Sequence, residues 1–222
     1  MKKSVLIRAA LLCLLAVPAA GQVPAGPQEK MPLDGEVRVG RLDNGMTYYI
    51  RHYDNPRQRA DFFIAHDVGA LQEEDDQNGL AHFLEHMAFN GTANFPGKRM
   101  MEWLEGIGVK FGYDLNAFTT REYTCYRVSN VPLVRETVVD SCLLILHDWS
   151  HCITLDGGEI DKERGVIIEE LRQGEGPARR MWCGAAPLLY GDTRYATRNL
   201  IGHIDGLSTF PHDELRDFYG RW

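Results

Sequence analysis

The sequence predicts an α+β fold in which a mostly antiparallel sheet packs against helices. Short stretches alternate between apolar and polar residues, as half-buried strands do, and longer stretches repeat apolar residues at helical spacing. The two kinds of segment follow one another in pairs rather than in strict alternation. With 222 residues, 44% of them hydrophobic and 25% charged, the chain has the composition of one globular domain.

The first 21 residues have the pattern of a secretory signal peptide. A basic start, Met1–Arg8, precedes an apolar run, Ala9–Val17, and Ala19 and Gly21 can occupy the −3 and −1 positions of a cleavage site. The alternative is a membrane anchor, but the run is well short of the roughly 20 residues that span a bilayer. We therefore expect an exported, periplasmic or extracellular protein with no membrane attachment once residues 1–21 are removed.

The charge of the chain excludes one broad class of partner. The formal net charge is −7, and removing the basic signal segment makes the chain more acidic. No run of Lys and Arg is present to neutralise phosphates, so we do not expect binding to nucleic acid.

The cysteines carry little functional information. Four lie outside the signal segment: Cys125, Cys142, Cys152 and Cys183. None has the spacing of zinc ligands, and a chain of this length does not need a disulfide framework. If Cys142 and Cys152 share one helix, about 15 Å of helical rise keeps them from bridging each other. We expect all four to be small, buried apolar residues.

The folded domain is expected to span residues 35–222, after a linker at 22–34 that contains prolines, glycine and mixed charge. Its first elements are two alternating runs, Glu36–Arg41 and Met46–His52. Asn44-Gly45 between them predicts a hairpin, because both residues tolerate positive φ.

The remaining elements follow the same two patterns. Strands are predicted at Ala60–Val68, Lys110–Tyr113 and Asn116–Val128, and helices at Asn78–Phe89, Lys98–Glu105, Leu133–Ser150, Glu159–Gln173 and Asp213–Tyr219. Asn78 should cap the first helix, and Asn90-Gly91 should end it. The chain stops at Trp222 directly after a helix, with no closing strand, so it looks truncated and we expect it to be part of a longer protein.

The most informative motif is the pentad His82-Phe83-Leu84-Glu85-His86. Positions i, i+3 and i+4 of a helix share a face, so both imidazoles and the carboxylate project together. Two neutral imidazoles at this spacing can bind a zinc ion at about 2.0–2.1 Å. The carboxylate between them can then act as a general base toward water. The alternative is a polar helix face with two solvated histidines.

A catalytic zinc site needs a third protein ligand and an open position for water. In the predicted helix Glu159–Gln173, Glu163 and Glu170 are two turns apart and share a face, whereas Glu169 points about 100° away. A carboxylate beside the apolar stripe of this helix needs a partner, which a metal would provide. The alternative is three surface glutamates, and spacing alone does not choose between Glu163 and Glu170.

A second histidine pair, His147 and His151, also has i, i+4 spacing on a predicted helix. No acidic residue that could act as a base lies at the position corresponding to Glu85, so it makes a weaker metal site. A place on the helix surface or at the helix end is the favoured interpretation.

The motifs together resemble the pitrilysin/insulysin-type metallopeptidases, the inverzincins, whose signature is the inverted pentad His-x-x-Glu-His. The resemblance runs from about residue 36 to residue 222. Within this family, the sequence is similar to the bacterial exported branch, which includes the periplasmic zinc peptidases. Beyond the pentad it is carried by Leu42–Tyr49, Gly79–Ala81, Asn116–Thr119 and Glu163–Glu170.

The resemblance implies a complete set of roles at the metal. His82 and His86 would bind one zinc ion per chain, and Glu85 would activate water and pass its proton to the leaving amine. The seventh residue after Glu163 is the third ligand in this motif, which selects Glu170. Glu163 would support catalysis as an outer carboxylate that orients the site.

The same resemblance implies a fold and partners. The domain would be a two-layer metallohydrolase like that of the mitochondrial processing peptidase. Asn116, Ala117 and Phe118 would form an edge strand that pairs with an extended peptide or unfolded-protein substrate. Working enzymes of the family close a chamber from two homologous halves, so a C-terminal half or a partner chain is expected to complete this one.

The sequence is therefore compatible with two functions. The first is a zinc-dependent endopeptidase, or its metal-bearing domain. The second is a non-catalytic or inactive, truncated half that only helps to form a peptide-binding chamber. Such halves usually lose pentad residues in this family, whereas His82, Glu85, His86 and Glu170 are all present. The first function is favoured for that reason.

Overall fold

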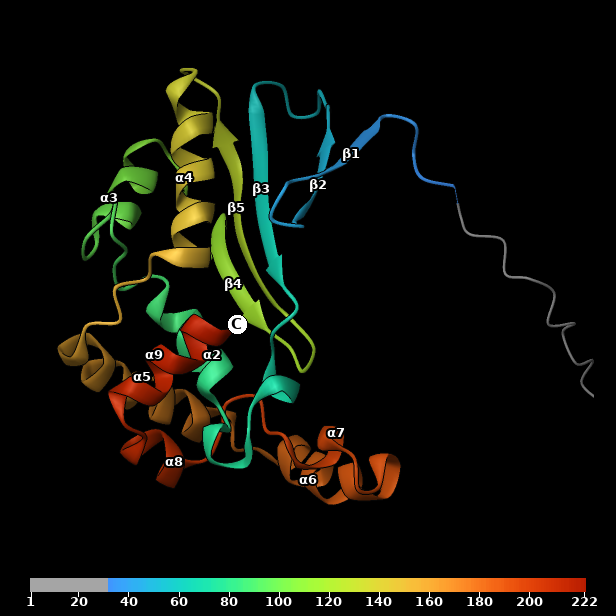
Figure 1. The fold of residues 1–222 in the computed structure, drawn as a ribbon, viewed down its shortest axis with the longest axis vertical. Coiled ribbons are helices and arrows are strands. Elements are labelled where there is room, and N and C mark those ends of the chain that lie inside the picture. Colours follow the sequence, from blue (N-terminus) through green and yellow to red (C-terminus); the bar gives the residue numbers. More distant parts are fainter. Residues whose placement is uncertain (1–31) are drawn as a thin grey trace, which may run out of the picture. The chain divides into compact units, whose positions relative to one another are not determined.

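The computed structural model describes residues 32–222, and the chain divides into two compact units between Tyr53 and Asp54 (Figure 1). The predicted signal peptide and nearly all of the predicted linker fall on residues 1–31, outside the described residues. None of the helices within residues 32–222 is both long and apolar enough to span a membrane.

The first unit contains the predicted hairpin. Strands β1 (Val37–Arg41) and β2 (Thr47–Arg51) pair antiparallel, with Arg41 opposite Thr47. Of the two turn residues, only Gly45 takes a positive φ, of 89°. The side chain of Asn44 instead accepts a hydrogen bond from the N–H of Met46, which closes the turn.

The second unit is built on an antiparallel sheet with strand order β3-β5-β4. Its strands are β3 (Arg59–His66), β4 (Leu115–Thr119) and β5 (Thr124–Pro132). The prediction of a single strand over Asn116–Val128 is wrong. The chain reverses after Thr119, where the hydroxyl of Thr120 donates to the carbonyl of Tyr123 and accepts from main-chain N–H groups.

The predicted strand at Lys110–Tyr113 is also wrong, because this stretch forms a turn. The carbonyl of Lys110 accepts from the N–H groups of Asp114 and Leu115, and the carboxylate of Asp114 accepts from the N–H of Lys110. Gly112 takes a positive φ of 80° within this turn. The turn leads directly into β4.

Helices account for most of the rest of this unit. They are α2 (Leu80–Met87), α3 (Arg99–Gly106), α4 (Thr137–His151), α5 (Gly157–Gly174), α6 (Pro177–Tyr190), α7 (Arg194–Thr197), α8 (Ile204–Thr209) and α9 (His212–Arg221), with short 3₁₀ turns η1 (Ala70–Gln72) and η2 (Asp75–Gln77). The predicted helices are confirmed with shifted ends, whereas α6 to α8 were not predicted. Helix α4 packs along β3 and β5, so the α+β fold is confirmed (Figure 1).

The core places α2 between the sheet and the C-terminal helices. Helix α2 contacts β4, α5 and α9, and its Phe83 and Met87 are buried. The ring of Phe83 meets that of Phe210 edge to face, with centroids 4.9 Å apart. Burying such side chains contributes about 1.5–3 kcal/mol each. The opposite face of α2 is thereby left for the pentad's polar groups.

The cysteine prediction is only partly right. Within residues 32–222 all four cysteines are free thiols, and Cys142 is buried in the core as expected. Cys125 and Cys152 are partly buried. Cys183 is exposed on α6, where Met181 and Leu188 are exposed as well, so this helix offers no core around the thiol.

Candidate metal centre

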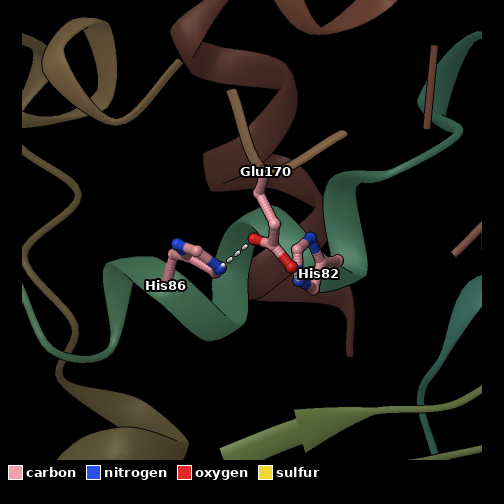
Figure 2. Close-up of side chains that lie close together, drawn as sticks. All are labelled: His82, His86 and Glu170. Carbon is pink, nitrogen blue, oxygen red and sulfur yellow. Dashed lines mark ion pairs between the residues drawn. The ribbon is translucent and has the colours of Figure 1, made fainter. Parts of the chain in front are cut away.

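The structure brings the two pentad histidines and one glutamate of α5 together. The imidazoles of His82 and His86 lie on one face of α2, with ring centroids 4.7 Å apart. The carboxylate of Glu170 reaches both, its oxygens lying 3.7 Å from Nε2 of His82 and 3.3 Å from Nε2 of His86 (Figure 2). Ligand atoms of the three residues all lie within 4.8 Å of one another.

Helix α5 brings its carboxylates to the site through its own packing. The side chain of Asp156 caps the helix by accepting from the N–H of Glu159. Apolar residues spaced along it are buried: Ile160, Ile167 and Leu171. Glu163 and Glu170 both reach the pentad, whereas Glu169 is exposed and accepts from the side chain of Gln173.

Glu163 contacts His86 on the side of the ring opposite Glu170. Its Oε1 lies 2.8 Å from Nδ1 of His86, and its Oε2 accepts from Nδ2 of Asn90 at 2.7 Å. Burial opposes ionisation, but these hydrogen bonds lower the pKa of Glu163. Burial likewise opposes protonation of His86, while the bond to Glu163 raises the pKa of this imidazole. A carboxylate in this place fixes the ring and its tautomer, leaving Nε2 free to bind a metal.

His82 has a different environment. Its Nδ1 is buried without a hydrogen-bond partner. Burial, together with the neighbouring His86, lowers the pKa of His82 to about 4, so the ring is neutral near pH 7. A neutral imidazole is the form that binds a metal.

The donor set fits zinc. Two imidazole nitrogens and one carboxylate oxygen are a known combination for catalytic zinc, and they leave a fourth position open. Two further carboxylates, Glu85 and Glu163, lie around these groups and interact with His86. A divalent cation would offset this concentration of negative charge.

Glu85 is a buried carboxylate on the same face of α2, only 8% exposed. Its Oε2 accepts a hydrogen bond of 2.6 Å from the hydroxyl of Thr119 at the end of β4. Burial raises the pKa of Glu85, against the opposing effect of Thr119. A carboxylate with a raised pKa, held in place by one hydroxyl, suits a group that takes up and releases a proton.

The predicted substrate strand lies at an edge of the sheet. Asn116, Ala117 and Phe118 belong to β4, which within the described sheet pairs only with β5. Asn116 and Phe118 are exposed, and Ala117 is buried. The N–H of Ala117 donates to the side chain of its neighbour Asn116 at 2.9 Å. This N–H therefore faces the open edge rather than β5.

Sequence reasoning missed two residues that hold the site. The sequence pattern gives Asn90 only the role of ending the helix, although it lies four positions after His86 and so on the same face. Thr119 belongs to a motif that carries the family resemblance, but no role is predicted for it, although strand periodicity places it two residues after Ala117 on the same side of β4. Both signals were visible in the sequence.

The second histidine pair does not form a comparable site. The rings of His147 and His151 stack 5.7 Å apart at the end of α4. His147, Asp148 and Cys152 do lie close together. The oxygens of Asp148, however, already accept from the hydroxyl of Thr92 and from the main chain and side chain of Asn94. This carboxylate ties α4 to the loop after α2.

Comparison with known proteins agrees with the geometry. Residues 49–178 match the family described as Insulinase (Peptidase family M16). The chain is 38% identical over 192 residues to "Probable zinc protease PqqL" of Escherichia coli, covering 86% of this chain and 20% of that protein. A Haemophilus influenzae protein of the same name is 32% identical over 214 residues, covering 96% of this chain and 23% of the relative.

The fold is similar to a solved structure as well. The crystal structure of the first half of the periplasmic protease PqqL from Escherichia coli superposes with a TM-score of 0.81 at 38% identity. The match covers 86% of this chain and 41% of that one. The chain thus spans about a fifth of the length of the curated relatives it matches.

Proposed function

Because the chain belongs to the insulinase family of peptidases (M16), we propose that it is the metal-bearing domain of a zinc-dependent endopeptidase. Its substrates would be peptides or unfolded proteins. The observation that carries the proposal is the convergence of His82, His86 and Glu170 within 4.8 Å, beside the buried carboxylate of Glu85.

In this proposal His82, His86 and Glu170 hold one zinc ion per chain. A bound zinc ion supplies Lewis-acid chemistry, polarising a substrate carbonyl and making water more acidic. Glu85 takes the proton from the attacking water and delivers it to the leaving amine. The hydroxyl of Thr119 holds the carboxylate of Glu85 while the proton moves.

Substrate would bind along β4. A peptide that pairs with the open edge can accept a hydrogen bond from the N–H of Ala117 once the side chain of Asn116 turns away. Because Glu85 is bonded to Thr119 in the same strand, pairing with β4 brings a substrate toward the proton-transfer group. Ala117→Pro removes this N–H and is expected to raise KM without releasing zinc.

The proposal extends to location and assembly. Residues 1–21 would be a signal peptide, 22–34 a linker and 35–222 the metallopeptidase domain of an exported, periplasmic protein. Support comes from the similar Escherichia coli structure, whose description is the first half of a periplasmic protease. A C-terminal half or a partner chain would complete the peptide chamber.

The experiment compares the protein with its Glu85→Gln variant. Both are expected to hold about one zinc per chain by elemental analysis, because Glu85 is not a ligand. Peptide cleavage should fall by about 10²-fold or more in the variant, since general-base catalysis is lost. If the full-length protein binds zinc but cleaves no peptide, the result would favour the alternative, a half that helps to form the chamber without catalysis.

A further inference from the structure

Helix α2 is too short to fix its own first turn. It spans only Leu80–Met87, and isolated helices of this length are not stable in water. The first N–H groups of any helix lack partners within the helix. Its N-cap residue, Gly79, has no side chain to satisfy them. The partner must therefore come from elsewhere in the fold.

The carboxylate of Glu73 fills this place. The side chain is fully buried, and its Oε1 accepts from the N–H of Ala81 at 2.9 Å. Its Oε2 accepts from the N–H of Gly79 and from Nδ2 of Asn78, both at 3.0 Å. A negative charge at a helix N-terminus is stabilised by the helix dipole as well. The prediction that Asn78 caps the helix is thus wrong, since Asn78 donates to the residue that does.

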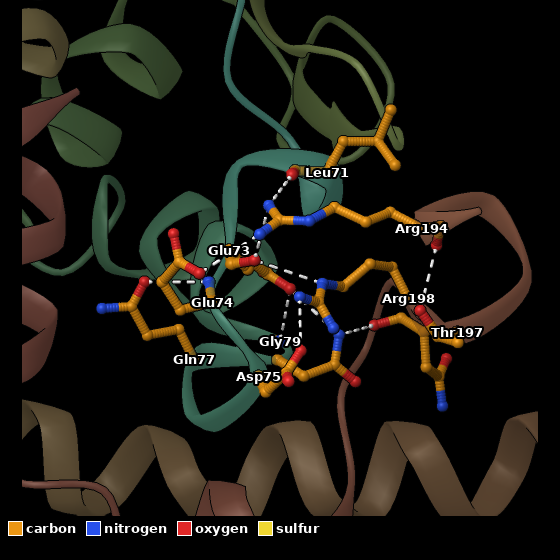
Figure 3. Close-up of polar contacts among 11 residues, drawn as sticks. Leu71, Glu73, Glu74, Asp75, Gln77, Gly79, Arg194, Thr197 and Arg198 are labelled. Carbon is orange, nitrogen blue, oxygen red and sulfur yellow. Dashed lines mark hydrogen bonds and ion pairs between the residues drawn. The ribbon is translucent and has the colours of Figure 1, made fainter. Parts of the chain in front are cut away.

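Glu73 is itself held from the far end of the chain. Arg198, only 6% exposed, donates from Nε to the carbonyl of Glu73 and from Nη2 to the carboxylate of Asp75 (Figure 3). Arg194 donates from Nη1 to the carbonyls of Leu71 and Glu73. Two guanidinium groups therefore bind main-chain carbonyls of the loop before α2. Because these acceptors belong to the main chain, the bonds do not depend on the side chains of the residues that provide them.

The main chains also touch at the start of α2. A Cβ added at Gly79 would lie 2.8 Å from Cα of Gly202, and one added at Gly202 would lie 2.5 Å from the carbonyl oxygen of Asn78. Both glycines have positive φ. Nδ2 of Asn78 also donates to the carbonyl of Asn199. A side chain at either glycine would therefore push the two main chains apart.

The consequence falls on His82 rather than on His86. The ring of His86 is oriented by Glu163, whereas Nδ1 of His82 has no partner. The position of His82 therefore depends on its backbone, which follows directly after Ala81, the residue whose N–H Glu73 holds.

We propose that Glu73, held by Arg198, is a positioning residue of the metal centre: it fixes the first turn of α2 and so the place of His82 opposite Glu170. The inference rests on the zinc function proposed above, because the ring it positions is one of the ligands. Residues 73 and 198 would then act on the metal through the main chain, with no contact to it.

The test measures zinc affinity by competition with a chelator, in the full chain and well below the unfolding temperature. In Glu73→Gln one oxygen becomes an NH₂ group, which faces main-chain donors and leaves one of them unsatisfied. We expect about tenfold weaker zinc binding or more, and an altered visible spectrum of the Co²⁺-substituted protein. Arg198→Lys keeps the charge but not the fork of donors, and should weaken zinc binding in the same direction.

Two controls separate positioning from stability. Glu74→Gln changes the next residue, an exposed carboxylate paired with Arg194, and should leave zinc affinity within about twofold. Val131→Ala shortens a buried side chain at the end of β5 and should lower the melting temperature without weakening zinc.

The outcomes distinguish the two proposals. A wild-type protein that binds no zinc overturns the proposed function, and this inference with it. A wild-type protein that binds zinc, with Glu73→Gln and Arg198→Lys binding it equally well, overturns the positioning role alone. If Glu73→Gln does not fold, Arg198→Lys decides, because it leaves the carboxylate in place.

Discussion

The two ends of helix α2 are held by different means. At the N-terminal end, Glu73 accepts from main-chain N–H groups and Arg198 donates to the main-chain carbonyl of Glu73, and these bonds are buried. At the C-terminal end, the ring of His86 is held by the side chain of Glu163, which is held in turn by Asn90. Changes at the first end should therefore move the backbone, and changes at the second should turn a ring.

The largest effect is expected where both ends converge, at Glu170. Glu170→Gln keeps the shape but removes the charge that reaches both histidines, and zinc affinity should fall by more than about 100-fold, since losing an outer partner alone costs 10–100-fold. Glu169→Gln is the matched control, because Glu169 is exposed and bonds only within α5. Elemental analysis of both variants tests this. Zinc lost from Glu169→Gln and kept in Glu170→Gln would move the ligand by one position.

The two ends should respond to pH with opposite signs. Burial raises the pKa of Glu73 to about 7, against its hydrogen bonds from Ala81 and Gly79. The folded state then binds this proton more tightly than the unfolded chain, so the contribution of Glu73 to stability falls as pH rises between about 4.5 and about 7. The pKa of Glu163 is lowered instead, so its contribution is lost as pH falls.

Urea denaturation at about pH 5 and about pH 8, with chelator present, measures the first of these signs. Relative to Glu73→Gln, the wild-type protein should lose up to about 3 kcal/mol of unfolding free energy over this interval, because its raised pKa lies between the two pH values. Parallel pH dependences in the two proteins would show that the carboxylate titrates alike in both states. The two ends of α2 would then not differ in the sign of their pH dependence.

The side-chain relay at the C-terminal end predicts a different pattern. Glu163→Gln still accepts from His86 but without a charge, so zinc affinity should fall by about tenfold while the unfolding free energy of the metal-free protein changes little. Glu159→Gln, on the same helix and paired with solvent-exposed Lys162, serves as its control. Chelator competition and urea denaturation measure the two quantities. A large loss of stability without loss of zinc would contradict the relay.

The sequence predicts the metal-site residues of α2 but not the contacts that hold its N-terminal end. The spacing of His82, Glu85 and His86, and of Glu163 and Glu170, follows from helical periodicity, which is local. Choosing Glu170 needed a resemblance to known peptidases, which the family match confirms. The contact between Arg198 and Glu73 could not be predicted, because it joins residues 125 positions apart through a carbonyl that every residue has.

The same limit explains the errors in the fold. The predicted strand Asn116–Val128 contains β-formers on both sides of its turn, so propensity alone does not show where it reverses. Gly79 and Gly202 are visible as glycines, but nothing local shows that each excludes a Cβ on the other. Helices α7 and α8 have only four and six residues, too few to show helical periodicity, and α6 leaves Met181, Leu188 and Leu189 exposed.

The smallest predicted effect tests whether the C-terminal end acts as one unit. Asn90→Ala removes the donor to Glu163 but leaves the bond between Glu163 and His86, so zinc affinity should fall only about two- to fivefold, up to about 1 kcal/mol. If Asn90 works only through Glu163, the double variant with Glu163→Gln should bind zinc about as weakly as Glu163→Gln alone. Chelator competition on the four proteins of this cycle measures the coupling. Effects that add in full would mean that Asn90 reaches the metal centre by another route, for instance through the helix end beside Met87, and the ring of His86 would then be fixed by Glu163 alone.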